Sequence, residues 1–302
     1  MTVVAAVDCG TNTIKLLVAD LPDGPELERE SRVVRLGQDV DRTGVLADEA
    51  LQRTFAAIDE YTALVTRHPV ERIRFCATSA TRDAGNAAVF AAGVHARLGV
   101  DPDVVTGPAE ARLAYDGAVR HLRERPAVPV LVVDVGGGST ELILGDGEPT
   151  AEHSMDIGSV RMHERHLRSD PPTATEVAAA AADIDAHLDA CPVDPAAAAT
   201  VVGVAGTVTT VAAAVLDLPT YDRDAIDQSV LAVEDVHAAT ERLLAMTLAE
   251  RRALPFMHPG RADVIGAGAL VLDRVLRRTR AAGLVVSEAD ILDGIAWSLV
   301  DG

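Results

Sequence analysis

One short pattern occurs twice in this chain, and it restricts the fold more than any other feature. Each copy has an apolar run, an Asp-x-Gly turn with small polar residues, and a second apolar run. The first copy is VVAAVDCGTNTIKLLVAD at residues 3–20, and the second is LVVDVGGGSTELILG at residues 131–145. Short polar turns between apolar runs are typical of β-hairpins. The repeat predicts two domains of one plan, each beginning with a hairpin.

The two turns contain the residue types that bind phosphate. Glycine lets backbone N–H groups approach a ligand closely, and hydroxyl or amide side chains add further donors. The alternative is a purely structural turn that its aspartate holds in shape. We expect phosphate contacts from Thr11, Asn12 and Thr13 in the first turn, and from Gly136, Gly137, Gly138 and Ser139 in the second.

Charged residues near these turns supply candidates for further roles. Asp8 and Asp134 end the matching strands, and carboxylate oxygens are the ligands that Mg²⁺ prefers. Glu141 lies two residues past Ser139, on the same face of its strand, and is a second candidate for metal binding or for ordering water. The alternative for each is a structural hydrogen bond or a strand glutamate.

Two basic residues are candidate phosphate ligands. Arg82 lies in a polar Ser/Thr loop, where a guanidinium can bind phosphate through two N–H groups. Lys15, in the first hairpin, can add a point charge. By contrast, the segment RMHERH at 161–166 is interpreted as a solvated basic helix, because its arginines surround the two histidines with positive charge.

The composition excludes several classes of partner. The chain has 302 residues, a formal net charge of −19 and only 3% aromatic residues. Such a protein is a poor general binder of nucleic acid or of anionic membranes, and it lacks aromatic platforms for bases. A polyanionic substrate must therefore be held by local donors or through a metal ion.

No targeting segment is visible in the sequence. The N-terminus has no basic region, and the longest apolar stretch, 201–216, is too short and too rich in glycine and threonine to span a membrane. We therefore expect a cytoplasmic protein. A homodimer is compatible with the sequence, which shows no interface.

Strands alternate with helices in both halves of the chain, which predicts an α/β fold. The proline- and charge-rich segment RERPAVP at 123–129 precedes the second hairpin and predicts a domain boundary. We expect an N-terminal lobe at residues 1–124, with the first hairpin, and a C-terminal lobe at 125–302, with the GGGSTE hairpin.

Seven ordered blocks resemble the exopolyphosphatase/guanosine pentaphosphate phosphatase (Ppx/GppA) family of the actin-like ATPase superfamily. They are DCGTNTIKLLVAD, FCATSATRDAGN, TGPAEARLAYDGA, VVDVGGGSTELILG, MDIGSVRMHE, VGVAGTVTT and GRADVIGAGA. The resemblance implies two actin-like (ribonuclease H-like) lobes with an active-site cleft between them. It also implies hydrolysis of a terminal phosphoryl group with Mg²⁺ (or Mn²⁺).

The third block places a candidate base. Glu110 opens a helix after a Gly-Pro turn, where position alone equally supports a general base or a glutamate that stabilises the helix dipole. The resemblance implies that Glu110 is the catalytic base. Glu141 is the candidate second catalytic carboxylate because of its position on the returning strand. The family pattern GxEEAR reads GPAEAR here, so Ala109 departs from it and puts the loop's charge and metal affinity in doubt.

The leading hypothesis is an exopolyphosphatase that releases phosphate from the end of inorganic polyphosphate, with short chains preferred. A pppGpp 5′-phosphohydrolase would share the same mechanism and is the alternative. Two hypotheses of other classes remain: a kinase of the actin-like fold, and a non-catalytic regulator that binds polyphosphate or an alarmone.

Overall fold

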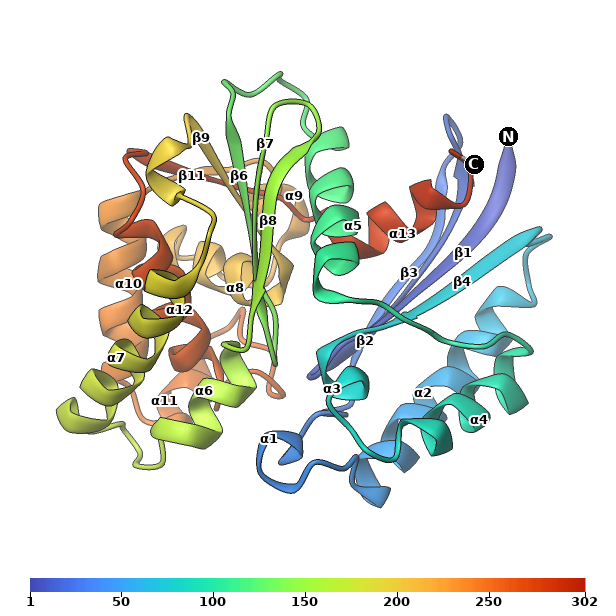
Figure 1. The fold of residues 1–302 in the computed structure, drawn as a ribbon, viewed down its shortest axis with the longest axis horizontal. Coiled ribbons are helices and arrows are strands. Elements are labelled where there is room, and N and C mark those ends of the chain that lie inside the picture. The colour runs from blue at the N-terminus through green and yellow to red at the C-terminus, as the bar shows by residue number, and fades with distance from the viewer. Residues whose placement is uncertain (302) are drawn as a thin grey trace. The chain divides into compact units, whose positions relative to one another are not determined.

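The computed structural model describes residues 1–301, which form two compact units. Unit 1 contains residues 1–117 and 291–301, and unit 2 contains residues 118–290. Both chain ends therefore belong to unit 1 (Figure 1). The last helix packs with the first unit, whereas the sequence analysis places all of 125–302 in one lobe. A helix's apolar face does not reveal from sequence which of two sheets it covers.

Unit 1 is built on a five-stranded sheet with the order β3-β2-β1-β4-β5. Its strands are β1 (Thr2–Cys9), β2 (Thr13–Leu21), β3 (Glu26–Val33), β4 (Arg72–Ala77) and β5 (Asp103–Val104). The helices are α1 (Val40–Thr43), α2 (Asp48–Val65), α3 (Ser79–Arg82), α4 (Ala87–Leu98), α5 (Gly107–Arg120) and α13 (Ile291–Ser298). Helix α5 runs on into unit 2 at its last residues.

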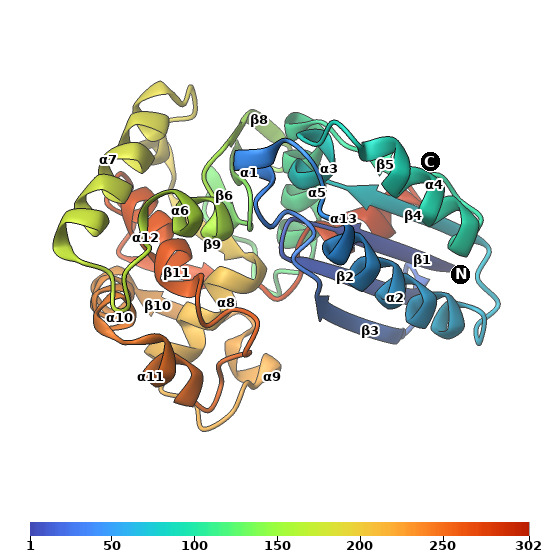
Figure 2. The same cartoon turned by 90° about the horizontal axis from the view of Figure 1, so that it is seen from below.

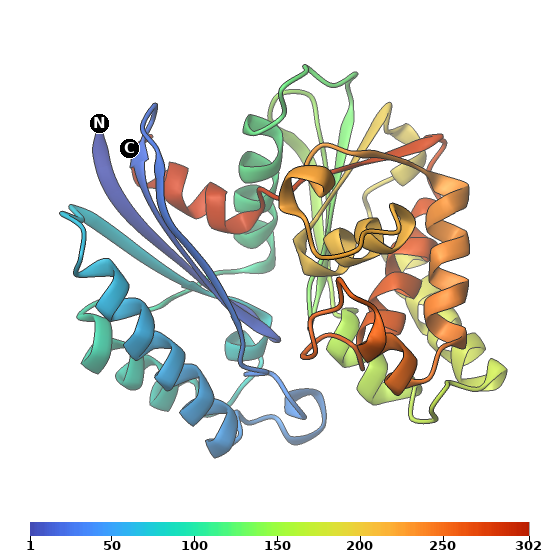
Figure 3. The same cartoon turned by 180° about the vertical axis from the view of Figure 1, so that it is seen from behind.

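Helices cover both faces of this sheet. Helices α2 and α4 lie side by side on one face, and α13 packs against β1 and β2 on the other (Figures 1 and 3). The buried side of α2 repeats at helical spacing, with Leu51, Ile58 and Tyr61 facing the core. The central strand β1 is covered from both sides, which explains its continuous apolar sequence.

Unit 2 repeats this plan with a six-stranded sheet of order β10-β11-β9-β6-β7-β8. Its strands are β6 (Val130–Val135), β7 (Thr140–Gly145), β8 (Pro149–Met155), β9 (Thr200–Val204), β10 (Val230–Ala232) and β11 (Gly283–Val286). The helices are α6 (Ser159–His166), α7 (Ala174–Ala190), η1 (Pro195–Ala197), α8 (Ala205–Val215), α9 (Arg223–Ile226), α10 (Val233–Ala245), α11 (Leu248–Ala253) and α12 (Ile265–Leu276).

The two sheets share one strand order. In unit 1, starting from β3, the antiparallel strands β3, β2 and β1 are followed by β4 and β5. In unit 2, starting from β8, the antiparallel strands β8, β7 and β6 are followed by β9 and β11. Strand β10 adds an antiparallel edge to unit 2 alone. This duplication confirms the predicted α/β fold of two similarly built lobes.

Helices of unit 2 pack in layers over its sheet. Helices α8 and α12 both contact β6, and α10 packs against both of them. Helix α6 contacts α7 and α12 (Figure 2). It follows β8 in the chain, and its first residues form hydrogen bonds to the turn between β6 and β7. The core of this unit is almost entirely aliphatic, in keeping with the few aromatic residues of the chain.

Candidate active site

The predicted site residues of unit 1 gather at one edge of its sheet. Strands β1, β4 and β5 run parallel, with Cys9 opposite Ala77 and Ala77 opposite Val104. The carboxyl ends of parallel strands form one edge, which is where ligands bind in open α/β sheets. The first hairpin turn, α3 and the start of α5 follow these three ends directly.

The first turn is closed by a hydrogen bond from Gly10 N to Thr13 O at 3.0 Å. The Thr11 hydroxyl pairs with Ser79 Oγ at 2.9 Å, which ties the turn to α3. Asn12 is buried, and its Oδ1 has no hydrogen-bond partner within residues 1–301. A buried polar atom without a partner is rare and favours a ligand or water at that place.

Asp8 and Lys15 are direct neighbours across the β1–β2 ladder. Lys15 Nζ lies 3.7 Å from Asp8 Oδ2, and the Asp8 side chain is almost fully buried. In this structure the lysine therefore offsets the charge of Asp8. The metal contact predicted for Asp8 and the phosphate contact predicted for Lys15 stay predictions.

Glu110 is held by Arg82. Arg82 Nη1 donates to Glu110 Oε2 at 3.1 Å and to Val105 O at 3.0 Å, and the carboxylate is buried at 7% exposure. The guanidinium thus orients the carboxylate from α3, at the edge where the first turn lies. Arg82 remains partly exposed, so its predicted phosphate contact stays a prediction, made through its other N–H groups.

In the second turn, Gly136–Ser139, the carbonyl groups and the N–H groups differ in their hydrogen bonding. Gly136 N donates to Ser139 O at 3.0 Å, as in the first turn. The carbonyls of Gly136, Gly137 and Gly138 all accept hydrogen bonds from the start of α6. Within residues 1–301, the N–H groups of Gly137, Gly138 and Ser139 donate to no other group. Successive N–H groups without an acceptor are the arrangement that anion-binding nests use, so the predicted phosphate contact of this turn is compatible with its geometry.

Asp134 and Glu141 lie directly opposite each other across the β6–β7 ladder. Both are buried, at 6% and 1% exposure, and Ser154 Oγ donates to Glu141 Oε1 at 2.7 Å. Like charges in opposed positions destabilise a sheet. A divalent cation beside the pair would remove that cost, and Mg²⁺ commonly uses one or two carboxylates, with water and substrate phosphate completing its shell.

The residues present therefore fit Mg²⁺ held partly by substrate. No group of three or more His, Cys, Asp or Glu side chains able to hold a metal occurs among residues 1–301. A cage made only of protein ligands is thus not part of the described structure. The carboxylate pair is the better candidate for a shared metal.

Sequence reasoning missed the residues that support the two turns. Ser79 supports the first turn, and α6 supports the second. Helix α6 is also not the solvated basic helix that its sequence predicted, because none of its residues is exposed and His166 Nε2 lies 2.8 Å from Asp183 Oδ2. Gly158, directly before α6, was the available signal, since glycine permits close backbone approach.

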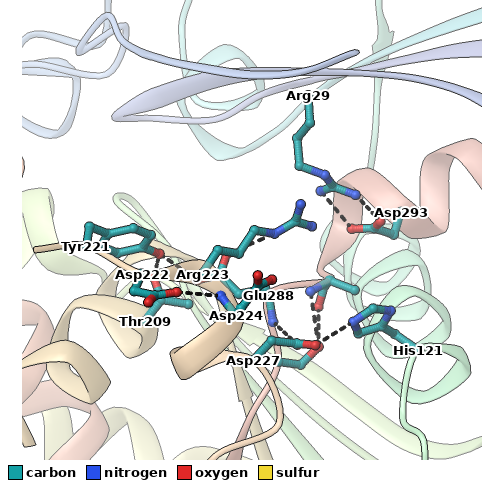
Figure 4. A network of polar contacts seen from close by, with 12 residues as sticks. Arg29, His121, Thr209, Tyr221, Asp222, Arg223, Asp224, Asp227, Glu288 and Asp293 are labelled. Carbon is teal, nitrogen blue, oxygen red and sulfur yellow. Dashed lines mark hydrogen bonds and ion pairs between the residues drawn. The ribbon is translucent and has the colours of Figure 1, made fainter. Parts of the chain in front are cut away.

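A second polar network lies near α8 and α9 of unit 2 (Figure 4). Tyr221 donates to Glu288 Oε1 at 2.6 Å, while Asp227 accepts from the Glu288 N–H at 3.0 Å and lies 2.9 Å from His121 Nε2. Burial raises the pKa of Glu288, and the Tyr221 hydrogen bond and Arg223 oppose that shift. Both carboxylates are therefore paired inside the network.

The cysteines offer no nucleophile. Burial, with a contribution from Asp8, raises the pKa of Cys9 well above its usual value, and burial raises that of Cys76 to about 12. Both therefore remain thiols at neutral pH, and a thiol is a poor nucleophile beside its thiolate. Neither thiol therefore enters the site as a reactive group, and the catalytic roles predicted for Glu110 and Glu141 stay predictions.

The fold and the two turns define an α/β protein of the actin-like class with one glycine-containing hairpin turn in each unit. Residues 18–301 match the Ppx/GppA phosphatase family, and the chain belongs to that family. It is 47% identical to exopolyphosphatase 2 of Mycobacterium tuberculosis, over 99% of both chains.

Two further comparisons agree with this assignment. The crystal structure of an exopolyphosphatase-like protein matches 99% of this chain and 97% of its own, with a TM-score of 0.95 and 45% identity. A guanosine-5′-triphosphate,3′-diphosphate pyrophosphatase of Vibrio cholerae is 36% identical over 57% of this chain and 35% of its own length. The predicted family and fold class are thereby confirmed.

In the described part of the chain, none of the helices combines the length and the apolar character that crossing a bilayer requires.

Proposed function

We propose that this protein is an exopolyphosphatase, which hydrolyses the terminal phosphoanhydride bond of inorganic polyphosphate and releases phosphate. The observation that carries the proposal is the Gly136–Ser139 turn, whose three N–H groups donate to no described residue, next to the buried Asp134–Glu141 pair. The full-length similarity to an exopolyphosphatase supports the choice of substrate.

Each group has a defined task in this proposal. The N–H groups of Gly137, Gly138 and Ser139 bind oxygens of the terminal phosphoryl group, and Thr11, Asn12 and Thr13 bind phosphate from the first turn. Glu110 accepts a proton from the attacking water, whose oxygen bonds to the terminal phosphorus while the bridging P–O bond breaks. The shortened polyphosphate leaves with the bridging oxygen.

Asp134 and Glu141 would hold Mg²⁺ or Mn²⁺, with Asp8 as a further candidate ligand. The ion supplies positive charge that offsets the charge of the phosphate oxygens as the reaction proceeds. This contribution matters in a chain with a net charge of −19, which by itself repels a polyanion. Arg82 orients the Glu110 carboxylate, so the departure at Ala109 leaves the base and its partner in place.

A pppGpp 5′-phosphohydrolase is the second candidate, supported by the similarity to the Vibrio cholerae enzyme over 57% of this chain. Both reactions transfer a terminal phosphoryl group to water, so the same residues would serve either substrate. They differ only in what lies beyond the reacting phosphates.

The test is phosphate release from short-chain polyphosphate and from pppGpp, measured side by side with Mg²⁺, with Mn²⁺ and with a metal chelator. We expect faster release from polyphosphate and none with the chelator. Faster release from pppGpp would make the second candidate the function. If neither substrate is hydrolysed, catalysis of this kind is excluded, and binding of both ligands and phosphate transfer from ATP would distinguish a regulator from a kinase.

A further inference from the structure

The Gly136–Ser139 turn is supported almost wholly by the backbone of α6. Ser159 N donates to Gly136 O at 2.9 Å, and Val160 N donates to Gly137 O at 2.8 Å. The carbonyl of Gly138 is different, because its partner is a side chain. Arg161 Nε donates to Gly138 O at 2.7 Å, and the arginine side chain is only 10% exposed.

The equivalent turn of unit 1 shows what this arginine replaces. The closing bonds Gly10 N to Thr13 O and Gly136 N to Ser139 O, both 3.0 Å, align Asn12 with Gly138. Asn12 O accepts from Val34 N at 3.0 Å and from Arg35 N at 2.9 Å. Two backbone N–H groups therefore fix that carbonyl in unit 1, and one guanidinium does so in unit 2.

Fixing the Gly138 carbonyl also fixes a donor. The Gly138 carbonyl and the Ser139 N–H belong to one peptide plane, and in a trans peptide they point in opposite directions. Arg161 therefore directs the Ser139 N–H away from α6, to the side where the turn's N–H groups donate to no other described residue. A charged donor on the carbonyl also polarises the peptide and strengthens that N–H as a donor.

We propose that Arg161 is a positioning residue for the reaction, which sets the peptide plane that presents the Ser139 N–H to the terminal phosphoryl group. The proposal rests on the proposed function. Arg161 acts through the turn and does not itself bind phosphate. The Asp156 carboxylate lies 3.9 Å from Arg161 Nη2, so the Nε bond to the turn is the shorter of these two contacts.

The test compares Arg161→Ala with Arg165→Ala, a matched control on the same helix whose Nη1 faces Asp183 at 3.5 Å and not the turn. We expect Arg161→Ala to lower kcat for polyphosphate by about 10-fold or more, with KM changed by less than about 3-fold, because a preorganised donor acts mainly in the transition state. Millimolar ethylguanidinium or the variant Arg161→Lys should restore part of kcat. Arg165→Ala should keep the wild-type rate and show no response to ethylguanidinium.

Three results would overturn the inference. If KM rises while kcat is unchanged, Arg161 is a phosphate ligand. If kcat and KM both stay within about 2-fold of the wild type, Arg161 has no part in the reaction, and if kcat falls equally in both variants without rescue, α6 has only a structural role. If the wild type itself releases no phosphate, the proposed function fails, and hydrogen exchange decides the role of Arg161: faster exchange at 136–139 in Arg161→Ala, and not in Arg165→Ala, supports it, and equal exchange contradicts it.

Discussion

Gly158 illustrates at the scale of a single residue how closely α6 approaches the second turn. A Cβ atom at this position would lie 2.5 Å from the Gly137 carbonyl oxygen and 2.6 Å from its carbon. Both atoms belong to the backbone, so a side chain could not move aside to make room. The absence of a side chain at Gly158 therefore allows the helix to bind the turn's carbonyls.

Gly158→Ala should lower the free energy of unfolding by about 1–3 kcal/mol, because the backbone must shift to relieve the overlap. It should also lower kcat, since the shift moves the turn that presents the phosphate donors. Urea unfolding and phosphate release measure the two effects. Gly85→Ala is the control, with its nearest atom at an ordinary 3.6 Å. Equal stability of the two variants would contradict this account of the contact.

The residue scale is also where sequence reasoning reached its limit. The residue types of the turns predicted a phosphate site, because glycine exposes backbone N–H groups and hydroxyl and amide side chains supply further donors. The pair Arg82–Glu110 and the bond from Arg161 to Gly138 were not predicted. Each joins residues more than twenty positions apart, and no local pattern indicates which partner an arginine side chain meets.

At the scale of secondary structure, the two hairpins differ at one ladder position. Asp8 faces Lys15 in unit 1, and Asp134 faces Glu141 in unit 2. The first pair is neutral overall, and the second places two buried carboxylates together. This difference is why we propose the second hairpin as the metal site. It could be anticipated from sequence only after both strands were paired in register.

Asp134→Asn should therefore separate stability from activity. Removing one of two opposed carboxylates should raise the free energy of unfolding by up to about 1 kcal/mol without metal. The same change should abolish most phosphate release and the stabilisation that Mg²⁺ gives. Thermal unfolding with and without Mg²⁺ tests this, with the exposed Asp146→Asn as control. A variant still stabilised by Mg²⁺ as strongly as the wild type would exclude Asp134 as a metal ligand.

The start of α7 carries a capping box in which Thr173 and Glu176 each bond the other's backbone N–H. The hydrogen bond from the Thr173 N–H lowers the pKa of Glu176 to about 2. Burial opposes this shift, and hydrogen bonds from the Thr173 and Ser169 hydroxyls add to it. The folded state thus favours the charged carboxylate. This contribution to stability is complete above the unfolded-state pKa near 4.5 and is lost as the pH falls toward 2.

Glu176→Gln should accordingly lower the urea midpoint at pH 7, and the difference from the wild type should shrink as the pH falls from about 5 to 3. The measurement is a series of urea unfolding curves for both proteins across this range. A difference that stays constant with pH would show that the Glu176 charge does not contribute to the cap.

At the scale of the whole molecule, the sequence predicted a duplication, and the structure shows it as one strand order in two sheets. The duplication could be predicted from the sequence because hairpins are formed by residues close in the chain and their turns contain distinctive residue types. The placement of α13 could not be predicted from the sequence. Its residues pack on β1 and β2, and Gly294 lies against the Leu113 carbonyl, so residues 291–301 complete the unit that the first residues begin.

We propose Glu110, oriented by Arg82, as the general base that activates water for phosphate release. The most direct measurement is steady-state phosphate release from short-chain polyphosphate with Mg²⁺ by the wild type and by Glu110→Gln, with polyphosphate binding measured on both. We predict that kcat falls by about 10²-fold or more while binding is retained, because the amide cannot accept the proton from water. A variant that retains the wild-type kcat would exclude Glu110 as the general base.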